Sequence, residues 1–529
     1  MSQTISGPVR VRFAPSPTGF LHVGGARTAI YNDLLRQSVG GAFVLRIEDT
    51  DRERSDAAMT RQIQSALAWI GTAWDEGPFL QSERLARHRE RGEELLAAGA
   101  AYRCFCSAEL LAEQRTEAQK RGVAFLYPRT CLGLAAAEVA ARVAAGESFA
   151  VRFRMPDDHI RFTDLVRGEM DFPPDALDDF ILLRSDGSPT YHMSVVCDDI
   201  DMRITHVIRG EDHLSNTPKH IPLFQALGGQ VPVFGHLPLI LGTDKKRLSK
   251  RSGATSVEEF RAEGILPQAL YNYLALLGWS PGGDREILSR AEMIALFSVD
   301  RLNASPAVFD REKLTWVNSQ YLSSLPLAEL LPHLRPFLAE VGLAAGVAPA
   351  GDGAGEGPGD SPGDGPGGGP GGSPEIDPLR LAAAIELHRG RVRTLRELAA
   401  VVVPYFRDRL DYPPDAIARF AADPDLPAHL AALRDRFASL PAFTKEALEA
   451  ELRAVAAERG IKAGALIHPT RTALSGSQAG PPLFDLVEVM GRDATLRHLD
   501  HLLDRLREPV PAAAGQVTPS AQPAQPGKG

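Results

Sequence analysis

The segment "FAPSPTGFLHVGGARTAIYNDLL", residues 13–35, decides the fold because it joins a predicted strand to a predicted helix through a turn rich in glycine and proline. The preceding "VRVRF", residues 9–13, alternates polar and β-branched residues as strands do. "AFVLRIED", residues 42–49, predicts a second strand, and between the two strands apolar residues recur at helical spacing: Ala26, Ala29, Ile30 and Leu34. This order predicts a βαβ unit and therefore a parallel sheet.

Length and composition set the limits on the rest of the chain. The 529 residues suffice for about three to five domains, and a hydrophobic content of 44% allows a sizeable core. Four cysteines argue against a disulfide framework and for a reducing compartment. The opening residues show no signal peptide, and no run reaches the roughly 18 apolar residues of a membrane span. We therefore expect a cytoplasmic protein without a membrane partner. The net charge of −9 argues mildly against nucleic acid, unless local basic patches override it.

Composition divides the chain beyond the first unit. Residues 75–200 resemble an insertion, with three cysteines between residues 104 and 131 and a hairpin predicted at Asp186-Gly187. Strand character returns at residues 203–212, and the helix that follows is predicted to be capped by Thr217 with Pro218 at its first position. Helical patterns then prevail from Val257 onward, interrupted by a Gly/Pro-rich stretch that we expect to be a flexible linker.

The glycine-bearing turn of residues 13–25 suits a phosphate ligand. Glycines at 19, 24 and 25 allow a close approach to the backbone, and the following helix N-terminus offers free N–H groups. His22 could donate to a phosphate oxygen. The spacing matches neither the dinucleotide fingerprint nor the P-loop. A plain Gly/Pro turn with a surface histidine remains the alternative at this point.

A second basic loop, "GTDKKRLSKRSGATSV", occupies residues 242–257. Lysine carries a point charge on a flexible stem and can follow a moving phosphate, so glycine-flanked lysines fit a phosphate clamp. The alternative is a solvated charged face. Two loops suited to binding phosphate, in one parallel-sheet domain that an insertion divides, suggest that a nucleotide is held between them.

These motifs resemble a known family. "HVGG" at 22–25 and "RLSKR" at 247–251 are similar to the HIGH and KMSKS signatures of class I aminoacyl-tRNA synthetases. Together with "RIEDTD", "PTYHMSVVCDDIDMRITHVIRGEDHLSNTPKH" and "FDREKLTWVNSQYL", they make the chain resemble bacterial glutamyl-tRNA synthetases. The resemblance covers nearly the whole chain and is looser in the C-terminal half, where the glycine-rich linker is a departure.

The resemblance implies a fold and a domain plan. We expect an α/β N-terminal half, with a class I Rossmann-like catalytic fold that carries an inserted α+β domain, followed by an all-α anticodon-binding half. The implied domains are a split catalytic domain at 1–75 and 200–256, an inserted acceptor-end domain at 76–199, a helical stem-contact domain at 257–344, a disordered linker at 345–376, a helical anticodon-binding domain at 377–508 and a disordered tail at 509–529.

The resemblance also implies the reaction and its residues. Such enzymes join glutamate to ATP, release pyrophosphate and pass the acyl group to tRNA(Glu), with Mg²⁺ neutralising the phosphates. Positioning and charge stabilisation supply the rate, and a monomer is expected. The implied catalytic residues are His22 and Lys250. The implied ATP site comprises Thr18, His22, Gly24, Gly25, Glu211, Arg247 (in place of a lysine), Leu248, Ser249 and Lys250, and the implied glutamate site comprises Arg12, Ala14, Ser16, Glu48, Tyr191 and Arg209.

The planar fork of arginine suits the two carboxylates of glutamate, and Glu48 would supply an anion for its ammonium group. The alternative for Arg12 and Arg209 is an ordinary strand-end role, and Glu48 could pair with a neighbouring arginine. Val195 is a departure, since some relatives carry asparagine there. One substrate hydrogen bond is then absent or mediated by water.

The cysteines of the insertion suggest a zinc site. "YRCFCSAE" and "YPRTC" supply three thiols, and Zn²⁺ prefers four tetrahedral ligands. Some relatives bind zinc here with a histidine or a tyrosine as the fourth ligand, which gives the set Cys104, Cys106, Tyr127 and Cys131. Buried reduced cysteines are the alternative, and Cys197 is predicted to belong to the core.

The C-terminal module carries "HRGRVRTLRE", in which Arg389, Arg393 and Arg396 fall at helical spacing. Such a stripe, with Arg391 beside it, could meet the tRNA anticodon. The alternative is a solvated helix paired with Glu386 and Glu397.

Three functions remain open. The first is a tRNA-charging enzyme, which either charges tRNA(Glu) alone or also charges tRNA(Gln). The second is a truncated-family enzyme that attaches glutamate to a tRNA base, against which the C-terminal module argues. The third is a paralogue that only binds RNA, which would not be expected to keep His22, Lys250 and the glutamate set together.

Overall fold

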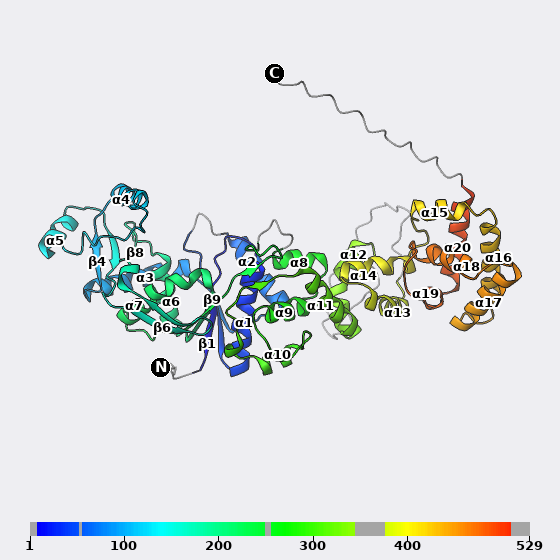
Figure 1. The fold of residues 1–529 in the computed structure, drawn as a ribbon, viewed down its shortest axis with the longest axis horizontal. Coiled ribbons are helices and arrows are strands. Elements are labelled where there is room, and N and C mark those ends of the chain that lie inside the picture. The colour runs from blue at the N-terminus through cyan, green and yellow to red at the C-terminus, as the bar shows by residue number, and fades with distance from the viewer. Residues whose placement is uncertain (1–7, 52–55, 249–254, 344–375, 509–529) are drawn as a thin grey trace, which may run out of the picture. The chain divides into compact units, whose positions relative to one another are not determined.

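The computed structural model describes residues 8–51, 56–248, 255–343 and 376–508 (Figure 1). The chain divides into two compact units, Met1–Tyr321 and Leu322–Gly529. The expected linker at 345–376 and tail at 509–529 fall almost entirely outside the described residues, as do Ser249 and Lys250 of the predicted ATP site.

The predicted βαβ unit is confirmed. Strand β1 (Arg10–Phe13) pairs in parallel with β2 (Ala42–Ile47), and helix α1 (Val23–Val39) connects them. The apolar positions predicted for this helix are buried, which explains why it packs on the sheet. Helix α2 (Ala57–Ile70) then leads to β3 (Glu76–Leu80), which pairs in parallel with β2. The β1–β2 sheet therefore continues past residue 76, where the inserted domain was expected to begin.

A second sheet has the order β7-β6-β10-β9. Its parallel strands β9 and β10 pair in register, and β9 meets β1 where Thr205 donates its N–H to the carbonyl of Arg10 at 2.9 Å. The sheet therefore joins the inserted region to the first βαβ unit. Its strands are β6 (Ile160–Asp164), β7 (Gly168–Phe172), β9 (His206–Gly210) and β10 (Val233–Leu237).

The rest of the insertion is an α+β layer with the antiparallel sheet β4-β5-β8. The predicted turn at Asp186-Gly187 forms, but its return arm is a single bridge between Leu183 and Pro189 before a helix begins. The elements are α3 (Leu85–Ala97), β4 (Ala101–Cys104), α4 (Ala108–Lys120), α5 (Ala136–Ala144), β5 (Ala150–Phe153), β8 (Ile181–Leu183) and α6 (Tyr191–Asp201).

The predicted cap of the next helix was wrong by one residue. Thr217 is the first residue of α7 (Thr217–Ala226), Pro218 is the second, and Asn216 is the N-cap without a side-chain hydrogen bond. A 3-10 turn over Glu211–Asn216 leads directly into α7, so the helix needs no threonine cap. The hydroxyl of Thr217 instead bonds side chains of the sheet.

The remaining elements are mainly helical, as predicted. The first unit adds β11 (Ile240–Leu241), α8 (Val257–Glu263), α9 (Pro267–Leu276), α10 (Arg290–Leu296), β12 (Ala307–Val308) and α11 (Arg311–Ser324), which crosses the division between the units. The second unit comprises α12 (Leu327–Glu340), α13 (Pro378–His388), α14 (Leu395–Val402), α15 (Pro414–Ala421), α16 (Leu426–Ser439), α17 (Lys445–Glu458), α18 (Gly464–Ser475), α19 (Leu483–Met490) and α20 (Arg492–Arg507). No helix in the described ranges is long and apolar enough to cross a membrane.

The predicted arginine stripe does not lie on one helical face. Arg389 and Arg391 belong to a 3-10 turn, Arg393 is in a loop, and Arg396 is in α14. The helix breaks because Thr394 starts a new one, accepting the N–H of Glu397 at 3.1 Å.

Two of these arginines are tied to their surroundings. Arg389 pairs with Glu386 at 2.9 Å, as the alternative interpretation expected, and it also donates to the carbonyl of Leu325. Arg396 pairs with Glu340 at 2.7 Å. Their role toward tRNA stays a prediction.

Candidate active site

A cavity of about 570 Å³ opens beside the carboxyl ends of β1 and β9. Ligands of open parallel sheets bind outside the carboxyl ends of the strands, so this is the expected place for a site. The cavity is lined by most of the residues predicted for glutamate and ATP, namely Arg12, Ala14, Ser16, Thr18, His22, Gly24, Gly25, Glu48, Tyr191, Arg209 and Arg247.

His22 stands at the N-terminus of α1 and is its N-cap. Its Nδ1 accepts the backbone N–H of Gly25 at 3.2 Å. Shielding from water and the nearby charge of Arg247 lower the pKa of His22, although Asp212 acts in the opposite direction. A neutral imidazole that accepts at Nδ1 carries its proton on Nε2, so Nε2–H is the donor left for a ligand.

Neighbouring side chains of the turn explain in part why glycines occupy positions 24 and 25. A Cβ added to Gly24 would lie 3.0 Å from the imidazole of His22, and one added to Gly25 would lie 3.0 Å from the side chain of Leu21. A side chain at Gly24 would therefore crowd the capping imidazole, and one at Gly25 would crowd the buried Leu21. No described atom lies within 4 Å of a Cβ added to Gly19.

Arg209 is buried and held by bonds from several sides. Its Nε–H donates to His236 at 3.1 Å and its NH1 to the phenol oxygen of Tyr191 at 3.2 Å. Its NH2 donates to the carbonyl of His213 at 3.2 Å and to the hydroxyl of Thr217 at 2.9 Å. Of the five N–H groups of an arginine, these bonds leave one on NH1. Burial is the main cause that lowers the pKa of Arg209.

Arg12 is tied at one end only. Its Nε lies 3.4 Å from Oδ1 of Asp199, and within the described part of the chain its two terminal nitrogens have no hydrogen-bond partner. The side chain is 4% exposed and lines the cavity. The geometry therefore leaves the planar end of the Arg12 guanidinium for a carboxylate.

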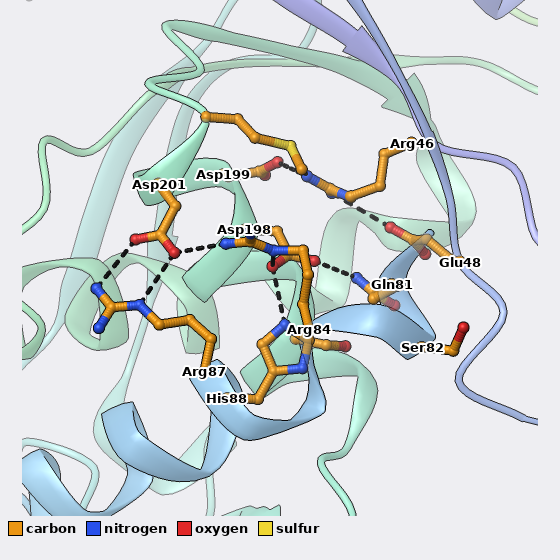
Figure 2. Close-up of polar contacts among 12 residues, drawn as sticks. Arg46, Glu48, Gln81, Ser82, Arg84, Arg87, His88, Asp198, Asp199 and Asp201 are labelled. Carbon is orange, nitrogen blue, oxygen red and sulfur yellow. Dashed lines mark hydrogen bonds and ion pairs between the residues drawn. The ribbon is translucent and has the colours of Figure 1, made fainter. Parts of the chain in front are cut away.

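Glu48 pairs with Arg46 at 3.3 Å, and Arg46 donates to Asp199 at 2.7 Å (Figure 2). The alternative that Glu48 pairs with a neighbouring arginine is therefore confirmed, but Glu48 also lines the cavity. Burial raises the pKa of Glu48, and the charges of Arg46 and Arg12 offset part of that effect.

Two described members of the predicted ATP site, Glu211 and Leu248, do not line the cavity. Glu211 pairs with Arg167 and accepts the N–H of Leu239 at 2.7 Å. Leu248 is described but lies outside the lining, while Ser249 and Lys250 lie outside the described residues.

Comparison with known proteins agrees with this geometry. Residues 8–316 match the family model described as "tRNA synthetases class I (E and Q), catalytic domain", and residues 329–503 match the one described as "Anticodon binding domain". The chain belongs to the class I tRNA synthetases of this E and Q type. This assignment confirms the predicted fold class, an α/β catalytic half followed by a helical half.

Individual relatives of this synthetase match over nearly their full length. It is 45% identical to glutamate–tRNA ligase 2 of Koribacter versatilis, over 94% of this chain and 98% of the relative. It is also 45% identical to glutamate–tRNA ligase of Desulforudis audaxviator, over 94% and 96%. A solved glutamate tRNA ligase of Elizabethkingia meningosepticum, in complex with its amino acid, superposes with a TM-score of 0.81 at 31% identity, over 95% of this chain and all of that one.

Some site residues of this synthetase were missed from the sequence. Asp199 holds Arg12 and Arg46, and His236 holds Arg209. A signal for Asp199 exists, because Tyr191, Val195 and Asp199 are four residues apart on the same face of α6. Val195, the noted departure, is buried and does not line the cavity.

The predicted zinc ligands of the synthetase come together. The thiols of Cys104, Cys106 and Cys131 lie within 4.8 Å of one another. The phenol of Tyr127 lies 3.3 Å from the Cys104 sulfur and 3.4 Å from the Cys106 sulfur. Three soft sulfur ligands suit Zn²⁺, whereas a phenol is an unusual fourth ligand, so a zinc ion at this group stays a prediction. Cys197 is buried outside this group, as predicted.

Electrostatics shift the pKa values of two of these thiols in opposite directions. Burial alone would raise the pKa of Cys104, but the hydrogen bonds with Tyr127 and Arg152 outweigh it and lower that pKa. Burial, together with the neighbouring thiols, raises the pKa of Cys106 to about 11.

Proposed function

We propose that the protein ligates L-glutamate to the 3′ end of tRNA in two steps. An oxygen of the glutamate α-carboxylate attacks the α-phosphate of ATP, a new P–O bond forms, and pyrophosphate leaves. A terminal ribose hydroxyl of the tRNA then attacks the carbonyl carbon of the adenylate, and AMP leaves. The observation that carries this proposal is the presence in one cavity of Arg12, Arg209, Glu48 and the His22 turn.

The amino acid end of the cavity fits glutamate by charge. The free end of the Arg12 guanidinium and the remaining N–H of Arg209 suit the side-chain carboxylate, with the Tyr191 phenol beside them. Glu48 and Ser16 would contact the ammonium and α-carboxyl groups. The solved relative from Elizabethkingia meningosepticum, which was crystallised with its amino acid, supports this use of the pocket.

The nucleotide end fits ATP. The turn before α1 and the N-terminus of that helix would hold phosphates, with Nε2–H of His22 donating to a phosphate oxygen. Arg247 lines the same cavity, and Lys250 belongs to the same loop of the sequence. Mg²⁺ neutralises phosphate charge when bound, and Asp212 is the lining carboxylate that we expect to contact it. Thr18, Gly24 and Gly25 would border the nucleotide, whereas Glu211 would act only after leaving Arg167.

The tRNA partner is expected to contact the inserted region and the helical unit. We propose tRNA(Glu) as the substrate, with Arg389, Arg391, Arg393 and Arg396 near the anticodon. The domain plan inferred from the sequence, a structural zinc ion on the cysteine group and a cytoplasmic monomer complete the proposal. Charging of tRNA(Gln) as well is the second candidate.

The test is exchange of labelled pyrophosphate into ATP with glutamate, with and without tRNA, followed by charging of purified tRNA(Glu) and tRNA(Gln). Glutamate-dependent exchange and charging of tRNA(Glu) are expected. Tight tRNA binding without any exchange would instead identify a paralogue that only binds RNA. Equal charging of both tRNAs would favour the second candidate.

A further inference from the structure

Behind Arg209 lies a second layer of buried polar residues. His236 on β10 faces Arg209 on β9 in the strand register, and its Nδ1 lies 2.6 Å from Oδ2 of Asp164 at the end of β6. Thr217 at the start of α7 completes the group, and its hydroxyl lies 3.0 Å from Nε2 of His236. Asp164, His236 and Thr217 are all at most 2% exposed. None of them lines the cavity, so none is placed to touch a substrate.

The hydrogen bonds in this group assign the protons. Nε2 of His236 faces the Nε–H of Arg209, which can only donate, so Nε2 must accept. The imidazole proton therefore sits on Nδ1 and is donated to Asp164. The Thr217 hydroxyl lies 3.0 Å from the same Nε2 and shares its one lone pair with the Nε–H of Arg209, while the hydroxyl oxygen accepts from NH2 of Arg209. Only a neutral His236 with its proton on Nδ1 satisfies all of these contacts.

The charges around His236 agree with a neutral ring. Burial is the main cause that lowers its pKa, the hydrogen bond to Asp164 and the charge of Asp164 act against it, and the charges of Arg209 and Arg12 add to the lowering. The ring of Phe234 stacks beside it, at an angle of 13° between the planes, and brings no charge.

We propose that Asp164 and His236 are positioning residues for glutamate recognition: Asp164 fixes the His236 tautomer, and His236, with Thr217, aims the Arg209 guanidinium into the cavity. This inference rests on the proposed function, because it gives Arg209 the side-chain carboxylate of glutamate. The inference also explains why the Arg209 guanidinium keeps one orientation. Without a correct acceptor at Nε2, the guanidinium would lose the bond at its Nε and turn.

The variant Asp164→Asn changes the tautomer of His236 while it keeps the size and shape of the side chain. Oδ1 of Asp164 accepts three backbone N–H groups, from Val166 at 2.9 Å, Arg167 at 3.0 Å and His236 at 3.2 Å. The amide oxygen of the asparagine must therefore take the Oδ1 place, which puts its NH₂ group against Nδ1 of His236. The imidazole must then accept at Nδ1 and carry its proton on Nε2, where it opposes the Nε–H of Arg209.

The kinetic test compares steady-state pyrophosphate exchange of the full chain with varied glutamate and varied ATP. We expect Asp164→Asn to lower kcat/KM for glutamate by about 10- to 100-fold, since small misplacements of a binding group have effects of that size. KM for ATP should change less than about threefold. The matched control is Asp171→Asn. Asp171 on β7 also bonds a histidine, His159 at 2.7 Å just before β6, but that pair is exposed and contacts no cavity residue. It should behave as wild type.

The structural test reads the tautomer by ¹⁵N NMR of histidine-labelled protein, with His236 assigned by its loss in His236→Asn. Wild type should show Nδ1–H, and Asp164→Asn should show Nε2–H. If Asp164→Asn does not fold, Thr217→Val should give the same split between glutamate and ATP, because it removes the hydroxyl that Arg209 NH2 uses. Wild-type glutamate kinetics in a folded Asp164→Asn, or an Nε2–H or doubly protonated His236 in wild type, would overturn the proposal. A wild type without glutamate-dependent exchange would overturn the proposed function instead. The NMR measurement would then still show whether Asp164 fixes the tautomer of His236.

Discussion

Oδ1 of Asp199 lies 2.7 Å from NH1 of Arg46, and both side chains are buried. The same oxygen is 3.4 Å from Nε of Arg12. One carboxylate of α6 therefore neutralises arginines from both β1 and β2. Asp199 contacts Arg12, which lines the cavity, and Arg46, which belongs to the core. Loss of its charge should therefore lower the stability of the fold and also alter the cavity.

The variant Asp199→Asn should destabilise the first unit strongly. It keeps the shape of the side chain but leaves the fully buried Arg46 with a weaker partner. Removing one member of a buried ion pair typically costs about 3–5 kcal/mol. Urea unfolding followed by circular dichroism measures the change. Asp171→Asn, which alters an exposed pair with Arg161, is the control and should leave the midpoint unchanged. Equal midpoints for both variants would show that Asp199 does not hold the buried arginine.

Acid stability should depend on Asp198, the neighbour of Asp199 that faces α3 (Figure 2). It accepts from His88 at 2.8 Å, Arg84 at 2.7 Å and Gln81 at 2.9 Å. Burial alone would raise the pKa of Asp198, but the bond with His88, the charge of Arg46 and the bond with Arg84 lower it overall. A carboxyl whose pKa is depressed in the fold contributes stability above its unfolded pKa of about 3.9.

That contribution is lost as the pH falls through the folded pKa of Asp198. Asp198→Asn should therefore be less stable than wild type at pH 7, and the difference in Tm should shrink below about pH 4. Thermal melts from pH 7 to pH 3 provide the measurement. A difference that stays constant over this range would mean that packing, and not the charge, is what the variant removes.

The first βαβ unit could be predicted because its signals are local. Periodicity placed β1, α1 and β2, and most of the site residues implied by the family resemblance line the cavity. The group behind Arg209 could not be predicted in the same way. Asp164, His236 and Thr217 come from three separate segments, and only the pairing of β6, β9 and β10 brings them together.

Helix ends were the least predictable features. Thr217 looked like a cap because threonine often caps helices, but a preceding 3-10 turn made a cap unnecessary and left its hydroxyl for Arg209. The arginine stripe failed because Thr394 and Glu397 start a new helix inside it. A local side-chain hydrogen bond therefore decided the second case, whereas the 3-10 turn decided the first.

Metal content tests the cysteine group of the insertion. Protein purified without chelator should contain about one zinc per chain, and Cys104→Ser should lose it because a main thiolate ligand is removed. Cys197→Ala, which alters a buried cysteine outside the group, should retain the metal. Atomic absorption provides the measurement. A metal-free protein that is folded and active would show that these cysteines only fill the core.

The basic loop is tested by Lys250→Ala. If Lys250 follows the leaving pyrophosphate, adenylate formation should slow by about 10²–10³-fold, while glutamate binding stays nearly unchanged, because the lysine acts on charge that develops in the transition state. Rapid-quench kinetics of adenylate formation measures this. Lys246→Ala in the same loop is the control, since Lys246 is exposed and does not line the cavity. An unchanged activation rate in Lys250→Ala would remove its catalytic role.

Substrate choice is tested by Arg209→Gln. Glutamine differs from glutamate by an amide in place of one carboxylate oxygen. Arg12 and Arg209 border the same cavity, so a carboxylate between them gains charge-assisted bonds, whereas the NH₂ of an amide would face donors. Buried groups left unpaired cost roughly 1–3 kcal/mol each, and more when they are charged. Sites of this kind can discriminate by about 10⁴–10⁵. We therefore expect wild type to reject glutamine at activation without editing.

Arg209→Gln should lose glutamate activation steeply, and the ratio of kcat/KM for glutamate to that for glutamine should shrink. The loss alone decides little, because Arg209 also holds Tyr191 and Thr217, and their displacement would lower activity by itself. The ratio is the decisive quantity, since a general disturbance lowers both substrates alike while a lost charge lowers only glutamate. Steady-state kinetics with both amino acids and with tRNA present measures it. A variant that is slow but keeps the full wild-type ratio would assign Arg209 to structure or to ATP, and would leave Arg12 to read the side chain.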